Sequence, residues 1–352
     1  LYLGQMAEQG KGMEKDEAKA MDWYEKAKAY GCEEAGQAIG ALAFAWGQAL
    51  EEKAKAETEP QVRTDWQQAW RDYQRALAED YPGAAEKIKA LGLQLGKEME
   101  AKGQDAEALA YYQAALDLGR QDALLRAARL CVDPQSETFD FTEAWQLYQK
   151  AAQNAEDADA VSDEWNSRKA LVPLDVRVDC LRGVVKDKMA NAAYYYWGDK
   201  LSNPLDNAMK SYGARAGVTP EQVVLLCDST HSLFWGKGEE GFLITEDGQL
   251  ICSLGTKISL DALGPLEYRE EKLVATTSGT VLARFKGESD EDPTFCDLLN
   301  EIVLLRHPQG QEQEASAQQP TSFCPQCGAP ADPGARFCGQ CGSPLPFTKS
   351  KS

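Results

Sequence analysis

The sequence predicts a multidomain protein: an N-terminal all-α solenoid of helix-turn-helix repeats, a middle α+β domain and a small cysteine-rich module. Three observations lead to this prediction. A tyrosine-centred motif recurs in residues 1–155, short apolar runs separated by turn residues follow residue 217, and two C-x2-C pairs lie after residue 322. The middle domain is expected to contain a small antiparallel sheet and a capping C-terminal helix. At 352 residues the chain is long enough for several domains.

The tyrosine-centred motif is A-x3-Y-x2-A. Its three defined positions share one face of a helix, so small alanines flank each tyrosine where a second helix can approach closely. Two units also agree in Gly31 with Ala35 and Gly119 with Ala123, a pattern that predicts a helix stop followed by the packing alanine of the next helix. The motif occurs at Ala20/Tyr24/Ala27, Ala69/Tyr73/Ala76, Ala108/Tyr112/Ala115 and Ala144/Tyr148/Ala151.

The first unit resembles a Sel-type repeat, the variant of the tetratricopeptide repeat with a longer inter-helix loop. The third unit has a loop four residues shorter and is closer to an ordinary tetratricopeptide repeat, while the second and fourth are degenerate. The resemblance implies antiparallel helix pairs stacked into a right-handed solenoid whose concave face binds peptides or partner proteins. The residues that carry it are Leu3-Gly4, Gly10-Lys11-Gly12, Asp16, Lys19-Ala20, Trp23-Tyr24-Glu25-Lys26-Ala27 and Gly31 in the first unit, and Leu95-Gly96, Gly103 and Ala108 to Tyr112 in the third.

Two interpretations of this solenoid stay open. Its helices could grip a partner, or they could only brace the rest of the chain. The net charge of −19 favours a basic partner, although charge on a solenoid is often just a solvated face. The first unit lacks the start of its first helix, so we expect the solenoid to be N-terminally incomplete. Whether upstream residues carry a further repeat, an anchor or a signal stays open.

Residues 156–173 begin with an acidic, polar run and are predicted to form a linker. A helix is then predicted from Leu174 to Leu201, and a second from Leu205 to Ala216 after a break at Pro204. The aromatic run Tyr194-Tyr195-Tyr196-Trp197 falls within the first of these helices. Because adjacent helical residues point in different directions, we assign this run to core or interdomain packing rather than to a ligand-stacking platform.

The middle domain is predicted to span residues 174–307. The run Leu226 to Thr230, the loop Gly236-Lys237-Gly238 and the run Gly241 to Gly248 resemble a bacterial pleckstrin-homology-like domain from about residue 217, with no chemistry to transfer. Strands are predicted at Val223–Cys227, Gly241–Thr245, Gln249–Ser253, Lys272–Thr277 and Thr280–Phe285, hairpin turns at Glu246-Asp247-Gly248 and Ser278-Gly279, and a closing helix at Pro293–Leu305.

Two C-x2-C pairs, each followed by a glycine, predict a tetrahedral site of four thiolates for one zinc ion. With four cysteines and no histidine nearby, no coordination position is left for water, so the expected zinc is structural. Unliganded thiols, a redox pair and a rubredoxin-like iron site are the alternatives; the redox pair lacks a βαβ context and rubredoxin has a longer spacing. The predicted metal ligands are Cys324, Cys327, Cys338 and Cys341.

Residues 322–345 resemble the short bacterial zinc-ribbon domain, with Phe323 and Phe337 each one residue before a cysteine pair. A module this small depends on its metal for folding free energy. Residues 308–321 are polar and are predicted to be a flexible linker that lets the ribbon move independently. Residues 346–352 are predicted to be a disordered tail.

No catalytic or organic-cofactor site is predicted. His231 and His307 are the only histidines, which removes most histidine-based triads and metal sites. The loop Gly236-Lys237-Gly238 lacks the spacing of a phosphate-binding loop. The six cysteines outside the ribbon follow no spacing pattern and are expected to be buried hydrophobes, and a thiolate zinc site fits a reducing cytoplasm. No run approaches the roughly 18 apolar residues of a membrane span.

The sequence therefore predicts a non-enzymatic, cytoplasmic, bacterial-type scaffold for protein–protein interaction. Its protein partners are expected in the solenoid groove and at the zinc ribbon. The alternative is a nucleic-acid-binding regulatory protein that acts through the ribbon, but Arg336, Lys349 and Lys351 are few charges for phosphate neutralisation and the net charge of −19 opposes it. An enzyme with a pocket in the middle domain is a third, less favoured interpretation.

Overall fold

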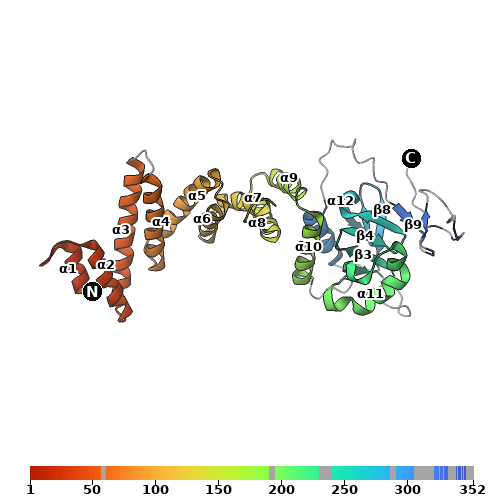
Figure 1. Cartoon of the computed structure of the whole chain (residues 1–352), viewed down its shortest axis with the longest axis horizontal. Helices are drawn as coiled ribbons and strands as arrows, with labels where there is room; N and C mark the ends of the chain where they lie inside the picture. The colour runs from red at the N-terminus through yellow and green to blue at the C-terminus, as the bar shows by residue number, and fades with distance from the viewer. Residues whose placement is uncertain are drawn as a thin grey trace. The chain divides into compact units, whose positions relative to one another are not determined.

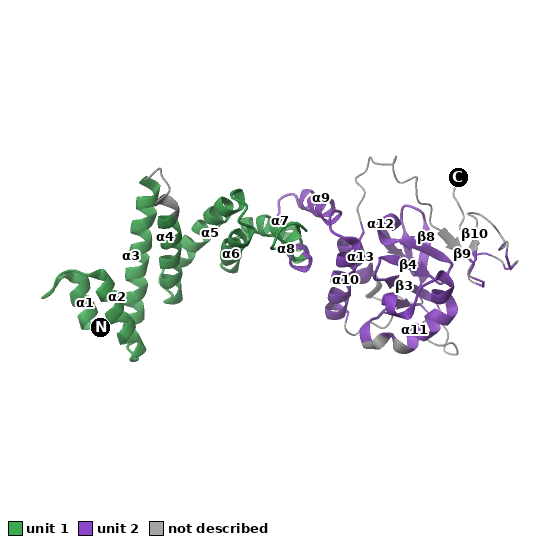
Figure 2. Ribbon diagram, viewed as in Figure 1, with its two compact units in different colours: residues 1–140, 146–154 green, residues 141–145, 155–352 purple. Residues whose placement is uncertain are grey.

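The computed structural model of the chain forms two compact units, one of residues 1–140 and 146–154 and the other of residues 141–145 and 155–352 (Figure 2). Each unit is described by itself below. The structure describes residues 1–56, 61–189, 195–229, 240–285, 291–304, 321–324, 326, 327, 329–331, 338, 340, 341, 343 and 345.

The first unit is a helical array in which each helix from α1 to α7 packs against the next (Figure 1). A short 3-10 turn, η1, precedes α7. The helices are α1 (Tyr2–Gln9), α2 (Glu17–Ala29), α3 (Glu34–Ala56), α4 (Gln61–Ala78), α5 (Ala84–Ala101), α6 (Asp105–Asp117), η1 (Gln121–Ala123), α7 (Leu124–Val132) and α8 (Phe141–Asn154), of which residues 141–145 belong to the second unit.

The predicted tyrosine motif marks the second helix of each pair. Its four tyrosines lie in α2, α4, α6 and α8, and each is at most 2% exposed. The glycines predicted to stop helices, Gly31 and Gly119, have φ angles of 86° and 89°, and the alanines predicted to pack after them, Ala35 and Ala123, are fully buried. The prediction of helix-turn-helix repeats is confirmed.

The structure also reveals the partners of the first three tyrosines. Each ring lies against a glycine of the preceding helix, so closely that an added Cβ atom would overlap it, and each hydroxyl donates to a glutamate four residues after that glycine. Burial raises the pKa of each tyrosine, and the carboxylate adds to this effect. The three sets are Gly4–Tyr24–Glu8, Gly47–Tyr73–Glu51 and Gly96–Tyr112–Glu100, with hydroxyl-to-carboxylate distances of 2.5, 2.6 and 2.5 Å.

This contact predicts opposite effects of side chains added to two helical glycines. Gly96→Val is expected to lower the free energy of unfolding of the array by about 3 kcal/mol, because the new methyls overlap the Tyr112 ring. Gly183 lies in α10 (Leu174–Lys188) with no atom within 4 Å of an added Cβ, so Gly183→Ala is expected to stabilise by about 0.5 kcal/mol. Urea unfolding followed by circular dichroism measures both; equal effects would contradict the close-contact argument.

Glu51 makes the array sensitive to acid. Burial alone raises the pKa of Glu51, but hydrogen bonds from Lys55, Lys87 and Tyr73 outweigh it and lower the pKa to about 2 from 4.5. The folded-state pKa is depressed, so the stabilisation is present above pH 4.5 and is lost as the pH falls toward 2. We expect Glu51→Gln to lower the free energy of unfolding by about 1 kcal/mol at pH 7, a value that allows for the screening of these ion pairs by water. Near pH 2 the same substitution is expected to have almost no effect.

Urea unfolding at several pH values measures this difference. The matched control is Glu52→Gln, since the neighbouring Glu52 side chain is 75% exposed and pairs with Lys55 on the surface of the same helix at 3.0 Å. A loss for Glu51→Gln that does not change with pH would show that the side chain acts by packing and not by charge.

The second unit contains two antiparallel sheets, of order β1-β2-β3-β4-β5-β9-β10 and β6-β7-β8. The strands are β1 (Tyr195–Tyr196), β2 (Val223–Asp228), β3 (Gly241–Thr245), β4 (Gln249–Cys252), β5 (Thr256–Ser259), β6 (Leu266–Arg269), β7 (Lys272–Ala275), β8 (Thr280–Arg284), β9 (Thr321–Phe323) and β10 (Pro330–Ala331). The helices are α9 (Ala158–Lys169), α10 (Leu174–Lys188), η2 (Gly198–Leu201), α11 (Ser202–Ala208), η3 (Met209–Gly213), η4 (Ala214–Ala216), η5 (Pro220–Gln222), α12 (Leu260–Leu263) and α13 (Glu291–Ile302).

The large sheet is covered on both faces. Residues paired directly across neighbouring strands point to the same face, and Tyr195, Cys227, Phe242 and Cys252 form one such row. Phe295 of α13 stacks on this row, with ring centroids 4.4 Å from Tyr195. The neighbouring row on the opposite face packs against the segment of α11 and η3, in a cluster that contains Leu201, Ala208, Tyr212, Leu226, Leu243 and Ile251. All of β2 and β3 is consequently buried.

The predicted linker at 156–173 is wrong, because α9 occupies most of it. The Asp157 side chain caps α9 by accepting from the backbone of Ala160, and Val161, Trp165 and Lys169 are buried. One acidic residue of the supposed linker is therefore a helix cap, and the exposed acidic residues of α9 lie on its solvent face.

The predicted helix over Leu174–Leu201 is also wrong beyond Lys188, where α10 ends. Tyr195 and Tyr196 form β1 instead, and Tyr195 and Trp197 are buried, which confirms packing as the role of that aromatic run. Pro204 does not precede a helix but lies within the first turn of α11, where its missing N–H has no intrahelical partner to lose. Tyr194 lies outside the described residues.

The predicted strands and both predicted hairpins of the middle domain are confirmed within one or two residues, and the closing helix α13 is confirmed within three. Gly248, in the first hairpin turn, has a φ of 71° that favours glycine. The strands β1, β5 and β6 were not predicted. The resemblance to a pleckstrin-homology-like domain stays a prediction. Of the helices in the described residues, not one has the length and apolar character needed to cross a membrane.

Candidate zinc centre

Four cysteine sulfurs converge at the C-terminal end of the second unit. The Sγ atoms of the four predicted ligands all lie within 4.8 Å of one another, and two of the pairs, Cys324–Cys341 and Cys327–Cys338, are 3.5 and 3.6 Å apart. Zinc–thiolate bonds of about 2.3 Å in a tetrahedron place sulfurs roughly 3.8 Å apart. The four sulfurs thus lie close to the separation that a tetrahedral zinc ion requires.

Two similar turns bring the cysteines together. In each turn the first cysteine is buried and the second is exposed. The backbone N–H of the first cysteine donates to the carbonyl five residues later, from Cys324 to Ala329 and from Cys338 to Ser343, both at 2.8 Å. The first turn is held by the β9–β10 pair, in which Phe323 lies opposite Pro330. This repeated geometry fixes one buried and one exposed sulfur on each side of the site.

Hydrogen bonds lower the pKa of the cysteine at two of these positions. The Ser343 hydroxyl and backbone lower the pKa of Cys341 to about 6. The backbone N–H groups of Cys341 and Gln340 lower the pKa of Cys338. The N–H of Ala329 acts in the same direction on Cys327, but hydrogen bonding among the thiols outweighs it and raises the pKa of Cys327 to about 12.

The residues fit a structural zinc ion. Four thiolates complete the tetrahedral shell that zinc prefers, and no position remains for a reactive water. A small cluster of Cys324, Ala329, Cys338 and Leu345 is the apolar interior of the module among its described residues. Because this interior is so small, the metal supplies most of the folding free energy of the module.

The zinc module joins the large sheet of the second unit. Strand β9 pairs with β5, with Thr256 opposite Ser322 and Lys257 opposite Thr321, and the Phe323 N–H donates to the Gly255 carbonyl at 2.8 Å. The Phe323 side chain is 7% exposed and belongs to the core cluster on the α11 face of the sheet. The prediction of an independently moving ribbon therefore does not hold for β9, which is a strand of the middle sheet.

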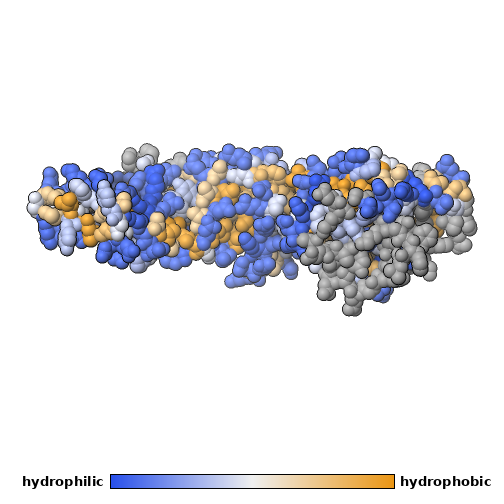
Figure 3. All heavy atoms as spheres, turned by 90° about the horizontal axis from the view of Figure 1, so that it is seen from below, coloured by the Kyte–Doolittle hydropathy of each residue, from blue (hydrophilic) through white to orange (hydrophobic). Residues whose placement is uncertain are grey.

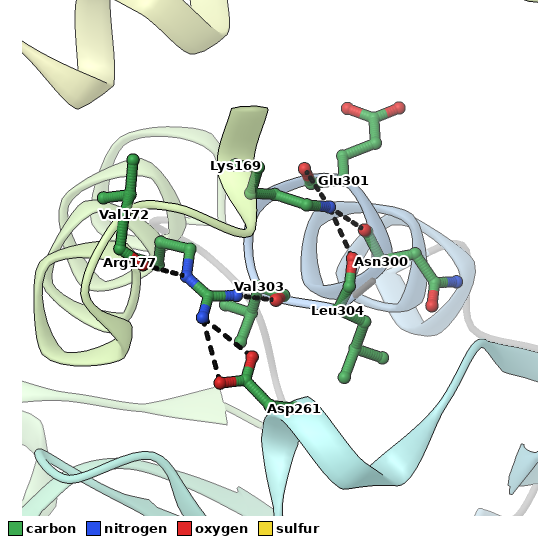
Figure 4. Close-up of polar contacts among 8 residues, drawn as sticks. All are labelled: Lys169, Val172, Arg177, Asp261, Asn300, Glu301, Val303 and Leu304. Carbon is green, nitrogen blue, oxygen red and sulfur yellow. Dashed lines mark hydrogen bonds and ion pairs between the residues drawn. The ribbon is translucent and has the colours of Figure 1, made fainter. Parts of the chain in front are cut away.

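A second group of polar residues, missed by the sequence analysis, lies where α13 ends (Figure 4). The fully buried Lys169 ammonium donates to the carbonyls of Asn300 and Glu301 at 3.0 Å each and to the carbonyl of Leu304. These are carbonyls at or just beyond a helix C-terminus, where intrahelical donors are absent and the helix dipole favours a cation. The indole of Trp165 also donates to the Glu301 carbonyl, at 2.8 Å.

Arg177 continues this group from α10. Its guanidinium donates to the carbonyls of Val172 and Val303 at 3.1 and 2.5 Å, and it pairs with the Asp261 carboxylate of α12 at 2.8 Å. Arg177 is 2% exposed. Together with Lys169 it ties α9 and α10 to α12 and to the end of α13, so we assign the group a structural role and not a catalytic one.

The other residues considered in the sequence analysis are the scattered cysteines, the histidines and the basic residues near the ribbon. Five of the six cysteines outside the zinc module are buried and Cys32 is half-buried, and burial raises the pKa of Cys252, and that of Cys296 to about 12. The five buried thiols match the prediction of buried hydrophobes, and Cys32 does not. His231, His307, the loop Gly236-Lys237-Gly238, Phe337 and the basic residues Arg336, Lys349 and Lys351 lie outside the described residues.

Comparison with a family of known domains agrees with the geometry of the cysteine site. None of the curated proteins matches the chain. A solved structure of a Sel1 repeat protein from Oxalobacter formigenes matches with 23% sequence identity and a TM-score of 0.22, over 48% of this chain and 62% of its own, so this chain spans less than two thirds of that protein. The zinc-ribbon domain family matches residues 323–345. The C-terminal end of the chain is therefore a zinc ribbon with a four-cysteine structural site.

Proposed function

We propose that the chain is a non-enzymatic scaffold that binds partner proteins through its helical array and its zinc ribbon. The observation that carries this proposal is the threefold recurrence of the glycine–tyrosine–glutamate contact, which builds stacked helix pairs of one kind. Arrays of this kind present extended surfaces, and their repeats contribute stability chiefly through contacts with their neighbours.

The zinc ribbon supports the same proposal. A site closed by four thiolates gives no place for a substrate at the metal, so the ribbon acts through its surface. Because β9 continues the large sheet, that surface is carried on the middle domain and is presented together with it. A partner held by the ribbon and a partner held by the array would then be kept on one polypeptide, which raises the effective concentration of each near the other.

Affinity capture with the full chain and two variants tests the proposal. Gly96→Val disrupts the array, and Cys324→Ser with Cys327→Ser removes half of the zinc shell. We expect each variant to lose a different set of captured proteins. Each candidate partner is then purified and its direct binding to the full chain is measured by calorimetry, with the same variants as controls. Captured proteins that fail to bind directly, or that bind all three chains equally, would contradict the proposal.

The nucleic-acid alternative is tested in the same preparation. A mixture of DNA and RNA fragments is titrated against the full chain at low and at physiological salt. We expect no binding, because the chain carries a net charge of −19 and would repel the phosphate backbone. Salt-sensitive binding that is lost in the cysteine variant would overturn the scaffold proposal in favour of the alternative.

A further inference from the structure

The first helix pair exposes apolar side chains, and several of them have counterparts in a later pair that are wholly or partly buried. Among the described residues, most of the exposed large hydrophobic side chains lie within residues 1–30, and Figure 3 shows apolar residues at the surface of that end of the array. They are Tyr2, Leu3, Met13, Trp23 and Tyr30, of which Tyr30 is 92% exposed.

The repeats allow each of these residues to be compared with its counterpart in the third pair. Gly4 and Tyr24 make the same contact as Gly96 and Tyr112, which aligns α1 with α5 and α2 with α6. Leu3 then corresponds to Leu95, Trp23 to Tyr111 and Tyr30 to Leu118. We call Leu3, Trp23 and Tyr30 the leading face. Their exposed fractions are 46%, 39% and 92%, whereas Leu95 is fully buried.

The counterparts of the leading face all belong to one junction between helix pairs. Leu95, Tyr111 and Leu118 lie in the cluster that joins α5 and α6 to the preceding helix, α4. The Tyr111 ring meets Trp70 of α4 edge-on, with centroids 5.1 Å apart. In this junction, α4 presents Trp66 and Trp70, one helical turn apart, to the pair that follows it.

The position of Tyr30 also makes a contact between helix pairs in the second pair. Glu79, which follows α4, corresponds to Tyr30 and Leu118, and it pairs with Lys28 of the preceding α2 at 2.6 Å. Tyr2 behaves differently, since its counterpart in α5, Gln94, is exposed as well. The positions of the leading face are thus contact positions in later pairs, and Tyr2 lies beside that face and not in it.

We propose that the leading face is a docking surface for another helix pair of this same repeat class. The second helix of that pair lies against Leu3, Trp23 and Tyr30 as α4 lies against Leu95, Tyr111 and Leu118. The occupant carries bulky apolar side chains one helical turn apart, as α4 does with Trp66 and Trp70. This inference goes beyond the scaffold proposal and does not depend on it, because it rests on an interface already formed within the chain.

The chain itself supplies the probe. A second copy of residues 33–92 is joined directly ahead of Leu1 in the full chain, so that the copied Gly92 precedes Leu1, the counterpart of Leu93. Hydrogen exchange is then compared in α1 and α2 of the natural and the extended chain. We expect protection of these amides to rise at least about tenfold in the extended chain, because the leading face becomes a junction between pairs.

Two substitutions make the result specific. Trp23→Glu is expected to abolish the gain in the extended chain while leaving the circular dichroism of the natural chain unchanged. Tyr2→Glu, beside the leading face, is expected to leave the gain intact. Protection that does not rise, or a gain that survives Trp23→Glu, would overturn the proposal. Sedimentation of the natural chain tests the other occupant: a dimer that Trp23→Glu dissociates would assign the leading face to a second copy and overturn it as well.

Discussion

Removal of zinc is expected to unfold the ribbon and to loosen the edge of the middle sheet with it. The metal contributes roughly 10 kcal/mol or more to the folding of a module of this kind. Phe323, one residue before the first ligand, is buried in the sheet core. Loss of the zinc site therefore releases β9 from β5 and exposes the backbone groups of β5 to water.

The Cys324→Ser and Cys327→Ser double variant tests this effect, with zinc content and hydrogen exchange as the measurements. The natural chain is expected to hold one zinc ion, and the variant to lose it and to exchange the amides of β5 (Thr256–Ser259) faster. Cys131→Ser, at a cysteine buried in the array, is the control and keeps its zinc. Retained zinc in the double variant would refute the assigned ligands, and unchanged protection of β5 would refute the coupling of the ribbon to the sheet.

The second large effect is expected at Lys169. Replacement by methionine keeps the length of the side chain but removes the donor from the carbonyls of Asn300, Glu301 and Leu304. Buried acceptors that lose their donor are costly, and we expect the free energy of unfolding of the second unit to fall by about 3 kcal/mol. The amides of α13 are expected to lose protection first, since its C-terminus is held by this side chain.

Arg168→Met is the matched control for this prediction. Arg168 is the preceding residue of α9, and its side chain is 39% exposed and paired with Glu164 on the same helix. A surface pair of this kind contributes less than about 1 kcal/mol. Urea unfolding of both variants, with exchange of the α13 amides as the local probe, gives the comparison. Equal losses of unfolding free energy in the two variants would show that the buried contacts of Lys169 stabilise the unit no more than a surface ion pair does.

The helical array could be predicted because its signal repeats within short distances. The tyrosine and its flanking alanines lie in one helix, and their spacing fixes one face. The glycine partners were harder to find, since Gly47 lies in a degenerate unit and a single glycine in a helix has many explanations. The recurrence of glutamate four residues after each glycine, as Glu8, Glu51 and Glu100, is the signal that identifies them in hindsight.

The middle domain could be predicted only where both partners are close in sequence. The hairpins of β3 with β4 and β7 with β8 are local and were found. Helix α9 was missed because its buried side includes Lys169, a residue type that normally faces water, and because the carbonyls that accept from it lie 131 to 135 residues away. This contact could not be predicted because its two partners lie far apart in the sequence, and not because the interaction between them is weak.

The spacing of the four cysteines was enough to predict the zinc site, but the pairing of the ribbon with the middle sheet could not be predicted. The four ligands need no information from the rest of the chain, because the metal itself selects their geometry. Strand β9 is only three residues long, and two of these, Thr321 and Ser322, are polar. Such a strand has no recognisable pattern until its partner β5 is known.

The pairing of β9 with β5 also determines the order in which the protein can be completed during synthesis. Contacts within the array are local and can form as soon as each helix pair leaves the ribosome. Strand β5 instead waits for residues 321 and 322, which are synthesised well after it, before its second edge is paired. Until then an unpaired strand edge is available to neighbouring nascent chains. The newly made protein is therefore expected to be most prone to aggregation just before β9 and the zinc ion join β5.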